Sequence, residues 1–333
     1  MSPGTSAAPQ VRRGLVLGAG GVLGAAWTIG ALAAVQAQYG WDPREAEILV
    51  GTSAGSVLAS FLGCGIGVDT LLDRQRGVAV VDPVKGVRQI DDDPDRDAGR
   101  ALPPRPRLGI GSARGVLSSA LRPWRSTPMM ALSAVLPQGR GSLAPIGELV
   151  DAVCPRGAWA GHPQTWIVTM DYDSGRRVVF GRDGAPHAGL RDAVMASCAI
   201  PGWYAPARIG GRRYVDGGAC SPTSLDLVTR LAAGRLDEVV VLSPMTSLDY
   251  DEPVSVAARM ERRFRRLVTK RLIGEVKKVA ATGTRVTLLG PGAEDLAGIG
   301  ANLMDPRRRE QVLETSLRTS AAALRASPLA ETG

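Results

Sequence analysis

Two short runs of apolar residues near the start of the chain each lead into a glycine-rich turn. The run at residues 15–17 enters a turn at residues 18–24, and the alanine-rich stretch at residues 25–38 then predicts a helix. A second apolar run at residues 48–50 enters the turn at residues 51–55, and another helix is predicted to follow. Strand, turn and helix in this repeated order predict an α/β fold, a three-layer α/β/α sandwich with a mainly parallel central sheet.

The hydrophobic periodicity breaks down between residues 69 and 138. Acidic, Pro/Arg-rich and Gly/Ser-rich stretches interrupt it, and only the apolar tract at residues 129–136 predicts a helix. We interpret this segment as an insertion, either a cover over the site or an ordinary surface excursion. Further elements are predicted at residues 166–170, 177–180, 190–197, 207–215, 238–242, 286–289 and 306–324.

The chain is predicted to form one domain with short tails. Its 333 residues suit a single large α/β domain, which we place at residues 11–326. Residues 1–10 and 327–333 are predicted to be disordered. The N-terminus lacks an apolar signal core, and no apolar run approaches the ~20 residues of a membrane span. We therefore expect a cytoplasmic protein, with peripheral membrane association as the further alternative.

The net charge of +8 favours an anionic partner. Nucleic acid, an anionic membrane or an acidic substrate would fit, but only 4% of the residues are aromatic, so we expect no nucleic-acid partner. The charge is densest between Arg259 and Lys278, where nine Lys and Arg residues stand against two Glu residues. This segment predicts an amphipathic helix that either lies on an anionic bilayer or packs on the sheet with a solvated charged face. Its apolar residues at helical spacing are Met260, Phe264, Leu267, Val268, Leu272 and Val276.

The pentapeptide Gly51-Thr52-Ser53-Ala54-Gly55 has the form G-x-S-x-G between a predicted strand and a predicted helix. Glycines two residues on either side of the serine leave room for a sharp, strained turn. Such a turn exposes the Ser53 hydroxyl at a helix N-terminus, where partial positive charge stabilises developing negative charge. The pattern therefore predicts a nucleophilic serine, although a plain Gly/Ser loop is the alternative.

The upstream turn runs from Gly18 to Gly24. A dinucleotide site of the form G-x-G-x-x-G would require glycine where this chain has Leu23, and no Gly-Lys-Ser/Thr follows for a P-loop. We interpret the turn as an oxyanion hole, because consecutive glycines let the N–H groups of Gly20 and Gly21 converge on one point.

The chain offers few histidines to act as the base. No histidine follows His187, so the Ser, Asp, His order of α/β hydrolases is not available in its usual form. A Ser53–Asp173–His187 arrangement remains an alternative. With only two histidines and four scattered cysteines we predict no metal site, and no cofactor motif is present.

Asp216 is the preferred candidate for the base. It ends a predicted strand, and Gly217 and Gly218 behind it leave its carboxylate unobstructed. Asp-Gly is a common turn sequence, so the assignment depends on the other motifs in the chain.

These motifs, in this order, resemble those of the patatin-like phospholipases. The resemblance extends from Leu15 to Leu313, with the middle insertion matching least. It is carried by residues 18–24, 51–56, 196–202 and 214–218, with Ser221-Pro222 behind them.

The resemblance implies a patatin-like catalytic domain that hydrolyses lipid or phospholipid esters without a metal. Ser53 and Asp216 would then form a catalytic dyad, and Gly20 and Gly21 would supply the oxyanion hole. One departure is Leu23, where the family usually has Arg or Lys, which removes a cation from this neighbourhood. An acyltransferase with the same dyad and a non-catalytic lipid-binding protein on the same scaffold are the alternatives.

Overall fold

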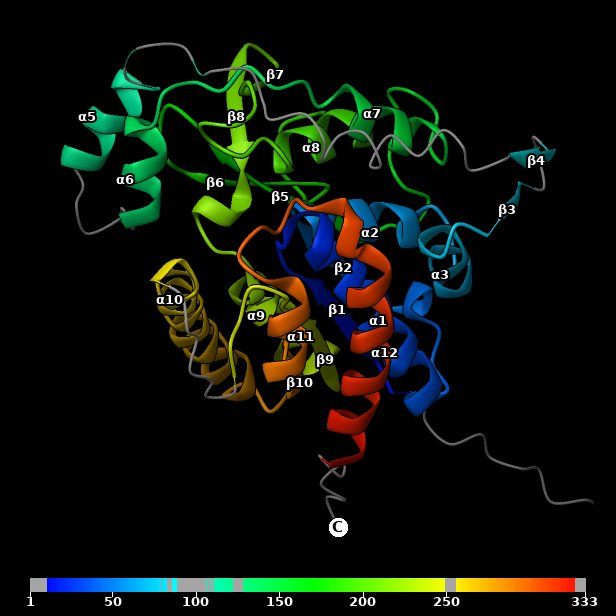
Figure 1. Cartoon of the computed structure of the whole chain (residues 1–333). Coiled ribbons are helices and arrows are strands. Elements are labelled where there is room, and N and C mark those ends of the chain that lie inside the picture. Colours follow the sequence, from blue (N-terminus) through cyan, green and yellow to red (C-terminus); the bar gives the residue numbers. More distant parts are fainter. Residues whose placement is uncertain are drawn as a thin grey trace, which may run out of the picture.

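The computed structural model describes residues 11–78, 80–82, 86–88, 106, 109, 111–121, 128–248 and 256–326 (Figure 1). The tails at residues 1–10 and 327–333 lie outside these described residues, as does much of the predicted insertion. The disorder predicted for the tails and the covering role considered for the insertion therefore stay predictions.

One large sheet forms the centre of the molecule. Its strand order is β10-β9-β1-β2-β5-β8-β7, and β6 pairs with β5 outside this path. The strands from β10 to β5 run parallel, whereas β6, β7 and β8 are antiparallel to their neighbours. This arrangement confirms the mainly parallel sheet. The strands are β1 (Arg13–Leu17), β2 (Ile48–Thr52), β5 (Thr165–Asp171), β6 (Arg177–Phe180), β7 (Ala207–Ile209), β8 (Arg212–Asp216), β9 (Glu238–Leu242) and β10 (Arg285–Leu289).

Helices cover both faces of this sheet, as Figure 1 shows. Alternate residues of a strand point to opposite faces, so Leu15 and Leu17 belong to one apolar core and Val16 belongs to the other. The predicted three-layer α/β/α sandwich is confirmed. The first core is covered by α1 (Gly21–Tyr39), α2 (Ala54–Gly63), α7 (Ala144–Asp151), α8 (Leu190–Ser197), α11 (Ala293–Ile299) and α12 (Arg309–Ala326), and the second by η5 (Leu225–Val228), α9 (Thr229–Arg235) and α10 (Val256–Ala280).

Helix α1 begins inside the glycine-rich turn, at Gly21, four residues earlier than the predicted start at Ala25. Gly20 is its N-cap, and the Leu23 side chain is fully buried in the first core, so packing extends the helix into a sequence that alone predicts a turn. The closing helix, predicted at residues 306–324, also begins differently. A short 3₁₀ turn, η6 (Pro306–Arg308), comes first, and α12 begins at Arg309.

The described parts of the predicted insertion attach to the fold in different ways. Its first residues belong to α3 (Val68–Gln75), whose Leu71 is buried in the first core. Two short strands, β3 (Val80–Asp82) and β4 (Gly86–Arg88), pair with each other. Helices α5 (Ala113–Leu121) and α6 (Pro128–Val135) pack together, and α6 contacts the turn η4 (Gly217–Ala219). None of the described helices is long and apolar enough to cross a bilayer.

Candidate active site

Ser53 lies on the sharp turn that the G-x-S-x-G pattern predicts, between β2 and α2. Its backbone has φ 54° and ψ −123°, a region that residues other than glycine rarely adopt. The flanking glycines are sterically required. A Cβ on Gly51 would lie 2.4 Å from the Gly55 carbonyl oxygen, and one on Gly55 would lie 2.2 Å from that of Leu17. The backbone strain at Ser53 is thus held by tight packing on both sides.

Asp216 reaches Ser53 because two strands meet end to end. Both strands pair with the same edge of β5. The parallel strand β2 pairs with β5 up to Val168, and the antiparallel strand β8 pairs with β5 from Thr169 onward. Ser53 follows the first strand and Asp216 ends the second. Gly217 permits this approach, since a Cβ there would lie 2.4 Å from the Val168 carbonyl oxygen.

The Asp216 carboxylate is buried, with 6% of the residue exposed. Burial raises the pKa of this carboxyl from 3.8 to about 6, while hydrogen bonds from the Ser53 side chain and the Gly218 N–H lower it in part. The Gly218 N–H donates to Oδ1 at 2.7 Å. At neutral pH the group is therefore an ionised carboxylate of increased basicity in contact with a serine hydroxyl, which suits a general base.

The glycine-rich turn divides its backbone N–H groups between two uses. Those of Gly18 and Ala19 hold the turn, since they donate to main-chain carbonyl oxygens of two distant segments at 2.9 and 2.8 Å. Those of Gly20 and Gly21 have no acceptor among the residues that the structure describes. Gly21 also has φ +62°, which favours glycine. Two adjacent N–H groups are thus available to an external acceptor.

Close packing brings this turn to the dyad. A Cβ on Gly20 would lie 2.6 Å from Cγ of Pro244, and one on Gly24 would lie 3.2 Å from the same atom. On the other side, a Cβ on Gly218 would lie 3.5 Å from the Ala19 Cβ. The structure therefore places the three predicted motifs next to one another.

Ser197 is a part of the site to which the sequence assigned no role. The Ser53 N–H donates to Ser197 Oγ at 2.8 Å, and Ser197 Oγ donates to the Val168 carbonyl oxygen at 2.7 Å. Two residues later, the Ala199 carbonyl oxygen accepts the Asp216 N–H at 3.0 Å. The C-terminal end of α8 and the residues directly after it therefore fix the backbone of both dyad residues. The presence of Ser197 in the 196–202 run was the only signal for it in the sequence.

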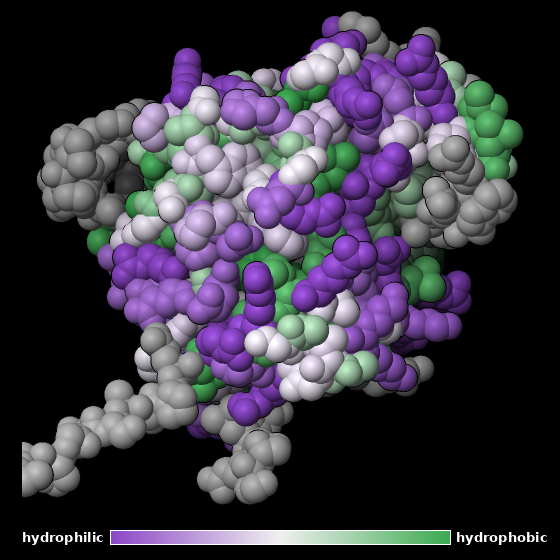
Figure 2. Space-filling view, turned by 180° about the vertical axis from the view of Figure 1, so that it is seen from behind, coloured by the Kyte–Doolittle hydropathy of each residue, from purple (hydrophilic) through white to green (hydrophobic). Residues whose placement is uncertain are grey.

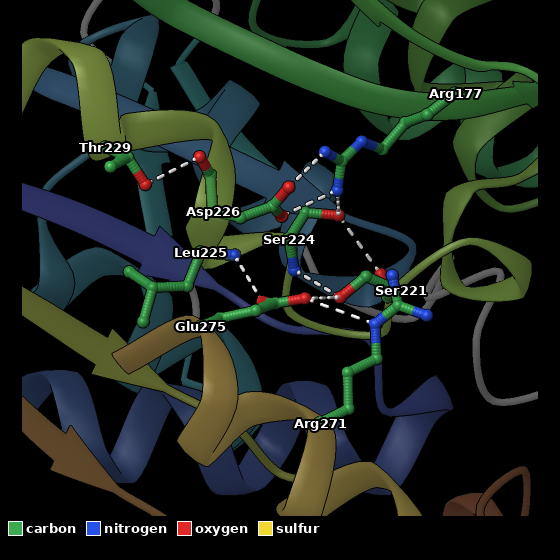
Figure 3. A network of polar contacts seen from close by, with 8 residues as sticks. All are labelled: Arg177, Ser221, Ser224, Leu225, Asp226, Thr229, Arg271 and Glu275. Atoms are coloured by element: carbon green, nitrogen blue, oxygen red, sulfur yellow. Dashed lines mark hydrogen bonds and ion pairs between the residues drawn. The ribbon is translucent and has the colours of Figure 1, made fainter. Parts of the chain in front are cut away.

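The segment that follows Asp216 is anchored by a buried carboxylate of α10 (Figure 3). Glu275 accepts the Ser221 hydroxyl at 2.8 Å and the Leu225 N–H at 3.0 Å. Beside it, Arg177 of β6 forms a two-pronged ion pair with Asp226. These contacts fix the chain between the dyad aspartate and the second core.

A second anchor from α10 supports the glycine-rich turn. Arg265 is fully buried and donates to the carbonyl oxygens of Pro244 and Thr246 at 2.5 and 3.2 Å, while Glu261 pairs with its guanidinium. Because Pro244 packs against Gly20, the inner face of α10 supports the turn as well as the aspartate.

The alternative triad is not assembled. Asp173 accepts the Ser112 hydroxyl at 2.9 Å and pairs with Arg213, which lowers the pKa of its carboxyl. His187 is exposed on the loop before α8. Leu23 points into the first core, so no side chain at that position faces the N–H groups of the turn. No group of three or more His, Cys, Asp or Glu residues in the described part of the chain is arranged to hold a metal ion.

A comparison with known proteins finds a protein family that matches most of the chain. The family model described as Patatin-like phospholipase matches residues 15–229, which include every motif discussed above. Among solved structures, VipD from Legionella pneumophila is similar over 96% of this chain and 68% of its own, with 14% sequence identity and a TM-score of 0.43. No curated protein matches the sequence.

Proposed function

The chain belongs to the patatin-like phospholipase family, whose members hydrolyse lipid esters, and from this premise we propose that Ser53 and Asp216 form its catalytic dyad. The observation that carries the proposal is a buried carboxylate with a pKa of about 6 that accepts a hydrogen bond from a serine on a strained strand-to-helix turn. An isolated Gly/Ser loop would provide neither the partner nor the burial.

The proposed reaction has two proton transfers in each half. Asp216 takes the Ser53 hydroxyl proton as Oγ attacks the ester carbonyl carbon. The oxyanion is stabilised by the N–H groups of Gly20 and Gly21 and by the N-terminus of α2. As the carbon–oxygen bond breaks, the leaving alcohol takes the proton from Asp216, and an acyl-enzyme remains. Water then gives a proton to Asp216 and attacks the acyl group, and that proton returns to Ser53 as the fatty acid leaves.

Lipid or phospholipid is the proposed substrate class, and no metal or cofactor takes part in the steps assigned to these residues. The proposal includes peripheral contact with an anionic membrane through the segment from Arg259 to Lys278. Transfer of the acyl group to an alcohol instead of water would use the same dyad. Product analysis with added alcohol distinguishes the two reactions.

The test is hydrolysis of a p-nitrophenyl ester series and of phospholipid vesicles, in the presence of a chelator. Ser53→Ala and Asp216→Asn should each lower turnover by about 1000-fold or more. Ser60→Ala in the same helix is the matched control, since its hydroxyl donates to the Val57 carbonyl oxygen within that helix, and it should retain activity. Equal turnover by wild type and Ser53→Ala would refute the assignment.

A further inference from the structure

The two faces of α10 differ in a way that the sequence did not predict. The inner face carries Arg265 and Glu275, the two buried anchors of the site, beside buried Leu272. By contrast, Met260 and Leu267, which belong to the apolar stripe predicted from the helical spacing, are each 68% exposed. Buried polar contacts with Pro244, Thr246, Ser221 and Leu225 therefore replace part of that stripe, and two large apolar side chains are left facing solvent.

The outermost line of α10 alternates apolar and cationic residues. At helical spacings of four, three, four and three, it reads Val256, Met260, Arg263, Leu267 and Lys270, all of them exposed. Both glutamates of the helix are turned inward, where each pairs with arginine. The outer face thus has no acidic side chain. Further exposed cations on it are Arg259, Arg266, Lys277 and Lys278.

A second exposed apolar surface lies on α5 and α6. Leu117 and Leu121 of α5 are 59% and 65% exposed, and Leu132 and Val135 of α6 are also exposed. Helix α6 contacts η4, directly after Asp216, and α10 contacts η5, a few residues further on. The helices that carry the two surfaces therefore both contact the segment that follows the dyad aspartate. Figure 1 shows α5, α6 and α10 on the same side of the molecule, and Figure 2, seen from behind, shows hydrophobic surface at the edge where α5 lies.

We propose that the outer face of α10, together with the exposed apolar residues of α5 and α6, is the surface by which this protein docks on an anionic lipid bilayer. The proposal rests on the proposed function, because a lipid acyl hydrolase must reach esters held in a bilayer. Cations draw the helix to anionic headgroups, and the apolar side chains between them enter the headgroup–acyl boundary. Docking through these helices brings the side of the protein that carries Asp216 close to the lipid.

The apolar residues of the outermost line decide between the anionic partners. A nucleic acid would use the arginines and lysines for its phosphates, but it would leave Val256, Met260 and Leu267 in water. A bilayer surface satisfies both kinds of side chain, since single apolar residues insert while neighbouring cations remain at the headgroups. The buried anchors Arg265 and Glu275 hold the helix to the site at the same time, so contact with lipid and support of the dyad come from opposite faces of one helix.

The test measures co-sedimentation with vesicles of phosphatidylcholine alone or mixed with phosphatidylglycerol, using Ser53→Ala protein so that no lipid is consumed. Arg263→Gln with Lys270→Gln should weaken binding to the anionic vesicles about 30-fold, at about fivefold for each cation near the surface. Met260→Ser with Leu267→Ser should weaken binding to a similar extent or more. The matched control is Arg208→Gln with Arg325→Gln, which removes the same charge from β7 and α12 and should leave binding unchanged.

Hydrolysis of a soluble p-nitrophenyl butyrate by the same substitutions in the wild-type background separates docking from catalysis. Reduced vesicle binding with unchanged turnover of the soluble ester is the expected result. Vesicle binding that is equal for the α10 variants and the matched control would overturn the docking proposal while leaving the dyad intact. A dimer in light scattering that Met260→Ser with Leu267→Ser dissociates would also overturn it, because the face would then bind a second copy. Vesicle binding without any ester turnover would refute the proposed function alone.

Discussion

Replacing Asp216 with asparagine should abolish activity and stabilise the fold at neutral pH. The folded protein raises the pKa of this buried carboxyl from 3.8 to about 6, so it binds the proton more tightly than the unfolded chain does. Stability contributed by this group therefore falls as the pH rises from about 4 to 6, and the full cost of burying the charge is present above about 6. Asparagine removes that charge and keeps an oxygen for the Gly218 N–H.

The magnitude follows from the two pKa values. The change from 3.8 to about 6 corresponds to about 3 kcal/mol of unfolding free energy at pH 7.5, at about 1.4 kcal/mol for each tenfold change in proton affinity. At pH 4 the carboxyl is almost fully protonated in the folded protein and partly protonated in the unfolded chain. The same calculation then gives a destabilisation of about 0.5 kcal/mol.

Urea unfolding of wild type and Asp216→Asn at pH 7.5 and pH 4 measures this difference. Asp173→Asn is the matched control, because Arg213 lowers the pKa of that carboxyl and the same substitution should destabilise the protein at pH 7.5. An Asp216→Asn protein that is less stable than wild type at pH 7.5, or whose gain does not shrink at pH 4, would refute the assignment of a charge-destabilised base.

Three further results are expected. Turnover of a soluble ester should rise with pH through an apparent pKa of about 6, because Asp216 must be ionised to accept the serine proton; a pH-independent rate between pH 5 and 7 would argue against it. Gly20→Ala should lower kcat by about 100-fold or more, since its Cβ would lie 2.6 Å from Pro244 and displace an oxyanion donor; steady-state kinetics and circular dichroism together separate this loss from misfolding. Ser197→Ala should lower kcat with little change in KM and destabilise the fold by about 1–3 kcal/mol, because the buried Ser53 N–H loses its acceptor; a normal kcat would show that the Ser53 turn holds itself.

Much of the fold could be predicted because local patterns and tertiary packing agree in it. The buried parallel strands are short apolar runs. The turns around Ser53 and Asp216 have no room for a side chain, and the glycines that this requires are visible in the sequence. The start of α1 could not be found in this way, because Gly21 is a poor helix former and only the burial of Leu23 extends the helix back to it.

The polar residues buried on the inner face of α10 could not be predicted from the sequence for a different reason. Hydrophobic spacing placed Met260, Leu267 and Val268 on one apolar stripe. In the structure Met260 and Leu267 are exposed, and Arg265 and Glu275 are buried on the same side of the helix as Val268. Their partners are carbonyl oxygens, a hydroxyl and an N–H from segments 19 to 54 residues away, and no local pattern contains that information. Ser197 is a similar case, since its donor, the Ser53 N–H, follows β2 and its acceptor, the Val168 carbonyl oxygen, lies in β5.

If Asp216 activates Ser53 as a nucleophile, a fluorophosphonate should label that serine, and peptide mapping of the labelled protein will show it. One adduct on Ser53 is expected in the wild type, no adduct in Ser53→Ala, and much slower labelling in Asp216→Asn. Labelling of another residue, or a rate that Asp216→Asn leaves unchanged, would contradict this assignment.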